Sequence, residues 1–558
     1  MAAPDVRASQ KAFRLPRALE ILLGVVVVLE LVAPFTSTTF GVDGSYHLHW
    51  LSEFTDLIAH GVWIPHWIPG AYFGFGAPSF YYYPPLTYYL GSIFRMVFGI
   101  TDPRWLFQLT GLLATIASFA SARLLFGVFS TSSYQKNIGA LLYAFAPLRI
   151  ADLYSRSNLS AHVSYVFVPF VWYGILLFFK PGTRQRNALL VFSGSIACLL
   201  LTNIPIFLLT ISGIVLAAFM YRKQLRFSIV RNAMVAVLLA MGLTAFYWSS
   251  ILSFRNDANL GDLLLVQPDY IILYIIHGSG IPAAYHIALL VGVCIELIAT
   301  VLKARKNRIA LSVSERRIAL LLEVFCVIMI FLNIPVISVP FWRFLPPLPL
   351  IQDAWRMYSV IVLLIAAMIA SATSLPIQKT ARNIIWLWVL GAILPVFLVV
   401  FNTHFYTHYD RSADVATEYL PTYAVPRTQV MSTMKDHAGE PLAMSVLSGE
   451  ERIALKSMDP RSETFHVQLS HPTPVIFHRF FWKGWHLYVH NNIMEDSPDS
   501  LGRATAVLPA GNYVAVWKLE PSNLERAGLI ITGLSIVGVL AMVGTCFFAK
   551  FTWKGGVE

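Results

Sequence analysis

A single carboxylate, Asp43, stands between glycines directly after a long apolar run, in the sequence Gly41-Val42-Asp43-Gly44-Ser45-Tyr46-His47. If the apolar run crosses a membrane, Asp43 lies at the membrane surface. A carboxylate in that place can act as a general base, taking a proton from an acceptor hydroxyl while a sugar leaves its carrier. His47 follows one helical turn later and could orient Asp43 or join it on a metal ion.

The same residues also have purely structural interpretations. An Asp before a helix is a common N-cap, and the residue types favour the base and the cap equally for Asp43. For His47, packing at the membrane interface is favoured over metal ligation. The aromatic residues downstream, including Tyr82 in the run Tyr81-Tyr82-Tyr83-Pro84-Pro85-Leu86, suit either a headgroup belt or stacking on sugar rings.

Three more charged residues could serve an anionic substrate. Asp152 and Arg156 stand at the end of an apolar run, and Arg356 stands where another begins. Burying a guanidinium at the end of a membrane span costs free energy, so such a residue often has a function. Its planar group can donate two hydrogen bonds to one phosphate. The alternatives are an interfacial Arg156 that extends to water and a salt bridge from Arg356 to Asp353. Arg343 is a weaker substitute for Arg356.

The composition requires that these residues be held by membrane helices. Of 558 residues, 56% are hydrophobic and 13% are charged, against about 25% charged in soluble domains. The net charge of +11 lies mainly in short loops between apolar runs, which is the positive-inside pattern of a multi-pass protein rather than a nucleic-acid-binding face. We therefore expect no nucleic acid among the partners.

Apolar runs predict about twelve full spans, with both termini cytoplasmic. They lie near 21–35, 105–127, 137–151, 161–179, 188–220, 232–252, 284–303, 317–337, 355–376, 382–401 and 527–549. The run 188–220 is expected to be a hairpin that breaks at Thr202-Asn203-Ile204-Pro205. The segment 84–99 is ambiguous; if it enters only the outer leaflet, every basic loop falls inside. Exterior loops are then expected at 36–83, 152–160, 253–283 and 338–354, with an amphipathic helix from Leu48 to Ala59.

Residues 402–526 are expected to form a separate exterior domain. The segment carries 14 acidic and 11 basic residues, and stretches such as Thr464–Leu469 and Asn512–Trp517 alternate apolar and polar residues. That alternation predicts β-strands, with a turn at 509–511. The predicted organisation is a mainly α membrane domain over 1–401, a small β-sandwich over 402–526, and a final helix with a cytoplasmic tail over 527–558.

The order of these motifs resembles the GT-C superfamily of membrane glycosyltransferases. That superfamily includes protein O-mannosyltransferases, oligosaccharyltransferase catalytic subunits and the lipid A aminoarabinose transferase. Within it, the chain is most similar to multi-pass proteins labelled pyruvoyl-tetrahydropterin synthase-related, a label that implies no pterin chemistry here. The matching positions are Gly41, Asp43, Tyr46 and His47; Gly74, Gly76, Pro78, Phe80, Tyr82, Pro85 and Leu86; Trp355 and Arg356; Glu418–Pro421; and Gly484 and Trp485.

The resemblance implies a GT-C fold and transfer of a sugar from a polyprenyl-phosphate donor to an exterior glycan, lipid or protein. Asp43 would be the catalytic base. Arg356, with Arg156, would hold the phosphate, and the β-domain would bind the acceptor. The family's usual Glu is absent near Ser160, which weakens the case for a metal site. The cofactor stays unknown, with a divalent metal as one alternative.

The sequence is also compatible with two other functions. A transporter or flippase would also be multi-pass, although no internal repeat stands out and acidic residues inside spans are few. A non-catalytic assembly protein for envelope polysaccharide would keep the fold without the chemistry, and the missing Glu near Ser160 favours it.

Overall fold

The computed structural model describes most of the chain and groups it into two compact units. The described residues are 13–36, 43–180, 182–220, 222–258, 313–332, 335–345, 348–351, 354–372, 375–401, 421–422, 424, 435–437, 443–444 and 452–551. The first unit comprises Met1–Gly44, Gln108–Ala240 and Leu265–Thr407; the second comprises Ser45–Phe107, Met241–Leu264 and His408–Glu558. The expected span 284–303 and the residues Asp353 and Glu418 lie outside the described residues.

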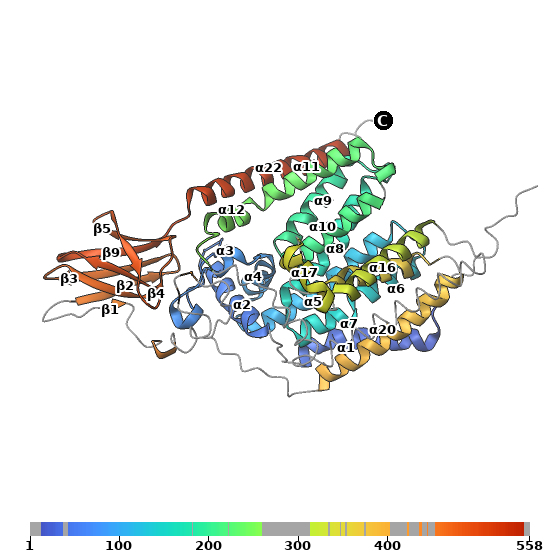
Figure 1. Ribbon diagram of the computed structural model, residues 1–558, viewed down its shortest axis with the longest axis horizontal. Helices are drawn as coiled ribbons and strands as arrows, with labels where there is room; N and C mark the ends of the chain where they lie inside the picture. Colours follow the sequence, from blue (N-terminus) through green and yellow to red (C-terminus); the bar gives the residue numbers. More distant parts are fainter. Residues whose placement is uncertain are drawn as a thin grey trace, which may run out of the picture. The chain divides into compact units, whose positions relative to one another are not determined.

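Helices make up the described part of the first unit (Figure 1). They are α1 (Arg17–Thr36), α5 (Pro103–Phe126), α6 (Ser133–Ala144), α7 (Pro147–Ile150), α8 (Leu159–Leu177), α9 (Gln185–Leu200), α10 (Ile204–Met220), α11 (Phe227–Leu243), α16 (Val313–Leu332), α17 (Pro335–Phe344), α18 (Leu348–Ile351), α19 (Tyr358–Ala370) and α20 (Leu375–Phe401). Short turns η2 (Ala151–Ser155), η3 (Arg222–Gln224) and η5 (Ala354–Met357) join some of them. Helices α1 and α20 lie side by side, as do α8 and α9.

The hairpin expected in 188–220 is present. Helix α9 ends at Leu200 and α10 begins at Ile204. The Asn203 side chain accepts a hydrogen bond from the Ile206 amide over 3.1 Å, which satisfies a donor at the start of α10. Pro205 sits in that first turn, where its missing N–H costs no helical hydrogen bond.

Two expectations about the helices need correction. The run 137–151 is broken, because α6 ends at Ala144 and Pro147 begins the separate helix α7. A proline cannot donate the hydrogen bond that would continue the first helix. The run 338–354, expected as a loop, is largely helical, in α17 and α18. Helix α17 continues through Pro340, which polarity alone did not indicate.

Three helices among the described residues are long and apolar enough to cross a bilayer: α5, α8 and Asn523–Gly544. A fourth would result if α11 and α12, which meet at a 66° bend, formed one span. The twelve spans expected from the sequence therefore remain a prediction. Helix α4, within the ambiguous segment 84–99, has 13 residues. At about 1.5 Å per residue it is shorter than the ~30 Å hydrocarbon core.

The second unit begins with helices that share an aromatic core. These are α2 (Gly44–Ala59), the turn η1 (Ala71–Gly74), α3 (Ser79–Tyr82) and α4 (Leu86–Phe98). Helix α2 contains the predicted amphipathic segment. Its Trp50 ring lies 4.6 Å from Tyr83, and its Phe54 ring lies 4.8 Å from Phe80. Because aromatic side chains bury a large apolar area, these contacts hold α2, α3 and α4 together as one folded layer.

The C-terminal strands form a β-sandwich, drawn in orange in Figure 1. They are β1 (Ala443–Met444), β2 (Arg452–Asp459), β3 (Ser462–Leu469), β4 (Thr473–Phe480), β5 (Trp485–Val489), β6 (Asn492–Met494), β7 (Asp496–Pro498), β8 (Arg503–Leu508) and β9 (Gly511–Leu519). One sheet has the order β1-β4-β8-β7 and the other β2-β3-β9-β5-β6. Phe477 of the first sheet contacts Phe465 and Trp517 of the second.

Both strands predicted from alternation are present, and they are neighbours. Residues 464–469 lie in β3 and residues 512–517 in β9, paired antiparallel with His466 opposite Val514. The turn predicted at 509–511 separates β8 from β9. Gly511 there has a φ of 138°, which a residue with a side chain would adopt only with strain.

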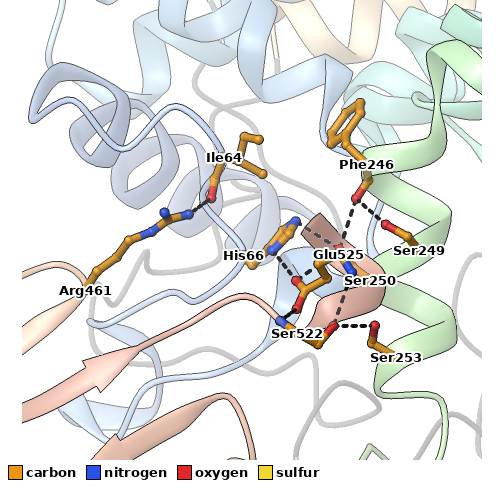
Figure 2. Close-up of polar contacts among 9 residues, drawn as sticks. All are labelled: Ile64, His66, Phe246, Ser249, Ser250, Ser253, Arg461, Ser522 and Glu525. Atoms are coloured by element: carbon orange, nitrogen blue, oxygen red, sulfur yellow. Dashed lines mark hydrogen bonds and ion pairs between the residues drawn. The ribbon is translucent and has the colours of Figure 1, made fainter. Parts of the chain in front are cut away.

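A polar clamp ties the end of the sandwich to two helices of the same unit (Figure 2). Helix α22 (Asn523–Phe551) begins with a capping box. The Ser522 amide donates to the Glu525 carboxylate over 2.8 Å, and the Glu525 amide donates to the Ser522 hydroxyl over 3.2 Å. Glu525 also lies 3.2 Å from His66 Nδ1, and Ser250 of α12 (Ala245–Ser253) donates to it. Because Glu525 is 2% exposed, these partners satisfy a buried charge.

Candidate functional site

Asp43 is held by the loop that precedes α8, more than a hundred residues later in the chain. Its amide donates to the Arg156 carbonyl over 2.9 Å. Its carboxylate accepts a hydrogen bond from Asn158 Nδ2 over 3.0 Å and lies 3.6 Å from Arg156 Nη2. The side chains of Asp43 and Arg156 are each 19% exposed. The carboxylate is therefore oriented from two sides and still reaches solvent.

The shape of the loop between α7 and α8 explains this convergence. After α7 the chain makes the π-helical turn η2, and Ser157 then takes a left-handed conformation with a φ of 58°. That conformation costs roughly 1 kcal/mol or more for a non-glycine residue. The loop is closed by the Asn158 amide, which donates to the Asp152 carbonyl over 2.8 Å. One short turn thus brings Asp152, Arg156 and Asn158 together.

Asp152 is the buried carboxylate of this site. It is 1% exposed, and the Tyr165 hydroxyl donates to its Oδ2 over 2.7 Å. Burial raises the pKa of Asp152 to about 6, an effect that Arg156, the Tyr165 hydrogen bond and Arg356 partly oppose and that Asp43 reinforces. The carboxyl group of Asp152 therefore changes charge near neutral pH.

Arg356 belongs to the same group of charges. It lies in η5, at the entry to α19, and its carbonyl accepts a hydrogen bond from Ser359 over 2.8 Å. Its side chain is half-buried, and its charge favours the ionised form of Asp152. Asp43, Asp152, Arg156 and Arg356 are called the charged cluster below. The first and last of these residues, Asp43 and Arg356, are more than three hundred positions apart in the sequence.

His47 and Tyr82, predicted to bind substrate, belong to the second unit and are engaged there. His47 is 2% exposed, and its Nδ1 lies 2.8 Å from the Tyr88 hydroxyl. Tyr82 is 4% exposed, and its hydroxyl donates to the Phe254 carbonyl. Both side chains therefore contribute to the packing of that unit, and their substrate-binding roles stay predictions.

Asn158 is the residue of this site that sequence reasoning missed. The sequence shows it only as part of Asn158-Leu159-Ser160, a glycosylation acceptor pattern that occurs often by chance. In the structure its Oδ1 accepts a hydrogen bond from the Ala161 amide over 2.9 Å, so Asn158 is the N-cap of α8. An Asn directly before an apolar helical run is a recognisable capping signal. Its pairing with Asp43 is a tertiary contact that no local pattern reveals.

The charged cluster has the chemistry of a site that receives a proton and holds an anion. Asp43 is a partly exposed carboxylate with the guanidinium of Arg156 3.6 Å away, and the charge of Arg356 acts on Asp152. In the part of the chain that the structure describes, no group of three or more His, Cys, Asp and Glu side chains is placed to hold a metal ion.

Comparison with solved structures finds two enzymes among those that are similar to this chain. The chain resembles ArnT from Cupriavidus metallidurans bound to undecaprenyl phosphate, with a TM-score of 0.32 and 13% identity over 63% of this chain and 77% of that one. It also resembles the Archaeoglobus fulgidus oligosaccharyltransferase tethered with an acceptor peptide, with a TM-score of 0.34 and 14% identity over 70% of this chain. That match spans 55% of the oligosaccharyltransferase chain.

No protein-family model and no curated protein matches the sequence. The two similar enzymes are of the kinds that the sequence resembles, and nothing among the comparisons bears on the pterin synthase label. Because the TM-scores are below 0.5, the chemistry of the site rests on the residues of this chain alone.

Proposed function

We propose that this chain is a membrane glycosyltransferase that transfers a sugar from a polyprenyl-phosphate donor to an acceptor on the exterior side of the cytoplasmic membrane. The observation that carries the proposal is the arrangement around Asp43. A solvent-reachable carboxylate is oriented by Asn158 and Arg156, and the charge of Arg356 acts on the same cluster.

In the proposed step, a new bond forms between the acceptor oxygen and the anomeric carbon of the sugar. The bond between that carbon and the phosphate oxygen breaks, and the polyprenyl phosphate leaves with the electron pair. Asp43 takes the proton of the acceptor hydroxyl. Arg356 and Arg156 offset the negative charge that develops on the leaving phosphate, which is the main electrostatic task of such a transfer.

The other roles belong to the same proposal. The helices of residues 1–401 would form the membrane domain, the sandwich within 402–526 would bind the acceptor, and 527–558 would return the chain to the cytoplasm. Twelve full spans and two cytoplasmic termini fit this arrangement, because the basic loops then lie inside.

The test compares two carboxylate variants in cells that lack the chromosomal copy. Asp43→Asn removes the base and keeps the shape of the side chain. Asp56→Asn is the matched control, because Asp56 of α2 lies in the same exterior segment, is 51% exposed and pairs with Arg95. Membrane glycolipids, glycans and polyprenyl-linked sugars are measured by mass spectrometry, with protein levels measured by immunoblot.

We expect Asp43→Asn to lose one glycosylated product and to accumulate its polyprenyl-phosphate sugar at normal protein levels. Asp56→Asn should match the wild type. An unchanged product profile in Asp43→Asn would refute the transferase proposal and leave the assembly role. Loss of the product without accumulation of an exterior donor would instead indicate a flippase.

A further inference from the structure

The outer face of the five-stranded sheet carries a groove of about 510 Å³. It is formed by β5, β9 and the turn that follows β5. The lining residues are Tyr488, His490, Asn491, Asn512, Tyr513, Val514 and Val516. A volume of this size is in the range of small-molecule sites, roughly 300–1,000 Å³.

The strand register shows that Tyr488, Asn512, Val514 and Val516 face outward, whereas Tyr513 shares the inner face with Ala515 and Trp517 and is 7% exposed. Tyr488 lies directly opposite Val516 in the β5–β9 pair. Their neighbours Leu487 and Trp517 are fully buried between the sheets. Because successive residues of a strand point to opposite faces, Tyr488 and Val516 must face away from the core. The groove therefore lies on the face of the sheet that points away from the sandwich core.

The turn at the end of β5 places the side chains of His490 and Asn491 at the groove, and both residues have a left-handed backbone conformation. Val489 pairs with Asn492, so His490 and Asn491 form a two-residue hairpin loop. Their φ values are 50° and 65°, as in a type I′ turn, for which Asn-Gly is the preferred sequence. A histidine in the first position costs roughly 1 kcal/mol more than glycine would. The His490 ring lies 5.1 Å from the Tyr513 ring, at the groove.

The lining chemistry matches a neutral sugar. Two carboxamides, Asn491 and Asn512, each donate and accept hydrogen bonds, as sugar hydroxyls do. The Tyr488 ring and two valines offer an apolar surface on which the C–H face of a pyranose ring can pack. The lining residues that the structure describes include no Asp, Glu, Lys or Arg. Glu520, which bonds to Tyr488, is paired with Lys518 over 3.0 Å.

We propose that this groove is a binding site for a neutral oligosaccharide. The inference rests on the proposed function only in identifying that saccharide as the acceptor, because the binding itself requires no transfer. The groove would hold one or two sugar rings against Tyr488 and Val516, with the amides and His490 hydrogen-bonded to hydroxyl groups.

The test measures saccharide binding to the full-length protein in lipid nanodiscs by saturation-transfer NMR and calorimetry. The probes are neutral trisaccharides of glucose, mannose, galactose, rhamnose and N-acetylglucosamine, with trigalacturonic acid as an anionic comparison. We expect saturable binding of at least one neutral trisaccharide and weaker binding of the anionic one. Absence of saturable binding across the neutral probes, or preference for the anionic one, would overturn the proposal.

Two variants locate the binding in the groove. The double variant His490→Asn with Asn491→Gly creates the preferred type I′ turn, so the fold should be retained while both side chains are replaced. Asn512→Ala removes a second amide at an exposed position. We expect each to weaken binding at least tenfold. Val507→Thr, on the other sheet and 56% exposed, should bind as the wild type does, and wild-type binding by the double variant would refute the site.

Asp43→Asn separates this inference from the proposed function. It should bind the trisaccharide like the wild type while losing transfer. Normal transfer by Asp43→Asn would disprove the proposed function and leave the groove in place. Failure of the saccharide binding alone would disprove the groove and leave the proposed transferase untouched.

Discussion

Asn158 joins the start of α8 to the carboxylate of Asp43. Its Oδ1 accepts from the Ala161 amide over 2.9 Å, and its Nδ2 donates to Asp43 Oδ2 over 3.0 Å. The helix start therefore fixes the orientation of the amide, and the amide fixes one oxygen of the carboxylate. Asn158 is therefore positioned to hold the carboxylate of Asp43 in one orientation.

Replacement of Asn158 by Asp should impair the proposed base without removing the helix cap. Asp is as good an N-cap as Asn, but it would put a second carboxylate where Asp43 now receives a hydrogen bond. The two like charges would repel each other, so the ionised form of the pair would be disfavoured. We expect an alkaline shift of the pH profile of product formation. Asn158→Ala, which loses the cap and the hydrogen bond but adds no charge, should lower thermal stability and shift the pH profile less than Asn158→Asp does. Identical pH profiles for Asn158→Asp and the wild type would contradict this role.

Substitution of Arg356 by Lys should weaken binding of the lipid phosphate. Lysine keeps the charge but loses the planar fork that meets two phosphate oxygens. Loss of one charge-assisted hydrogen bond of about 1.5 kcal/mol corresponds to roughly tenfold in affinity. The measurement is titration of undecaprenyl phosphate by native mass spectrometry. Arg123→Lys serves as control, because Arg123 is exposed and bonds to Asn137; equal losses in both variants would argue against a phosphate role for Arg356.

The charge of Asp152 should make phosphate binding depend on pH. Its pKa of about 6 leaves the carboxyl neutral below that pH and negative above it. When it is neutral, Asp43 alone opposes the two guanidinium groups of the charged cluster. When it is ionised, the cluster is neutral overall and should bind an anion less tightly, by about 1 kcal/mol or roughly fivefold.

Asp152→Asn isolates this effect from the titration of the phosphate itself. The Tyr165 hydrogen bond can be kept, because the amide oxygen still accepts it. We expect wild type and variant to bind undecaprenyl phosphate equally near pH 5, and the variant to bind more tightly near pH 8. A constant affinity ratio between pH 5 and 8 would show that Asp152 does not titrate in this range or does not act on the phosphate.

The clamp around Glu525 should contribute more to stability than nearby surface charges. Glu525→Ala removes the partner of His66 and one half of the capping box. Breaking a buried pair of this kind costs about 3 kcal/mol. Glu520→Ala removes a surface salt bridge to Lys518, which is 57% exposed, and should cost less than about 1 kcal/mol. Thermal unfolding in detergent tests the order, and equal Tm values for the two variants would mean that the clamp is not stabilising.

Local signals in the sequence were enough for many of the elements. The apolar runs indicated most of the helices, and Asn203-Ile204-Pro205 marked the break between α9 and α10 because both residue types act on the backbone within one turn. Alternation of polarity identified β3 and β9. Polarity was a poorer guide at 338–354, where α17 continues through Pro340, because packing against neighbours decides whether such a segment is helical.

For the candidate site, too, some features follow from the local sequence and others only from the tertiary structure. The sequence by itself determined that Asp43, Asp152, Arg156 and Arg356 stand at the ends of apolar runs, because residue type and hydropathy are local properties. Only the tertiary structure decided that a left-handed Ser157 turns the loop so that Asn158 and Arg156 reach Asp43, and that the charge of Arg356 acts on Asp152. Contacts between residues separated by more than a hundred positions depend on how the helices pack, and packing energy is shared among many side chains.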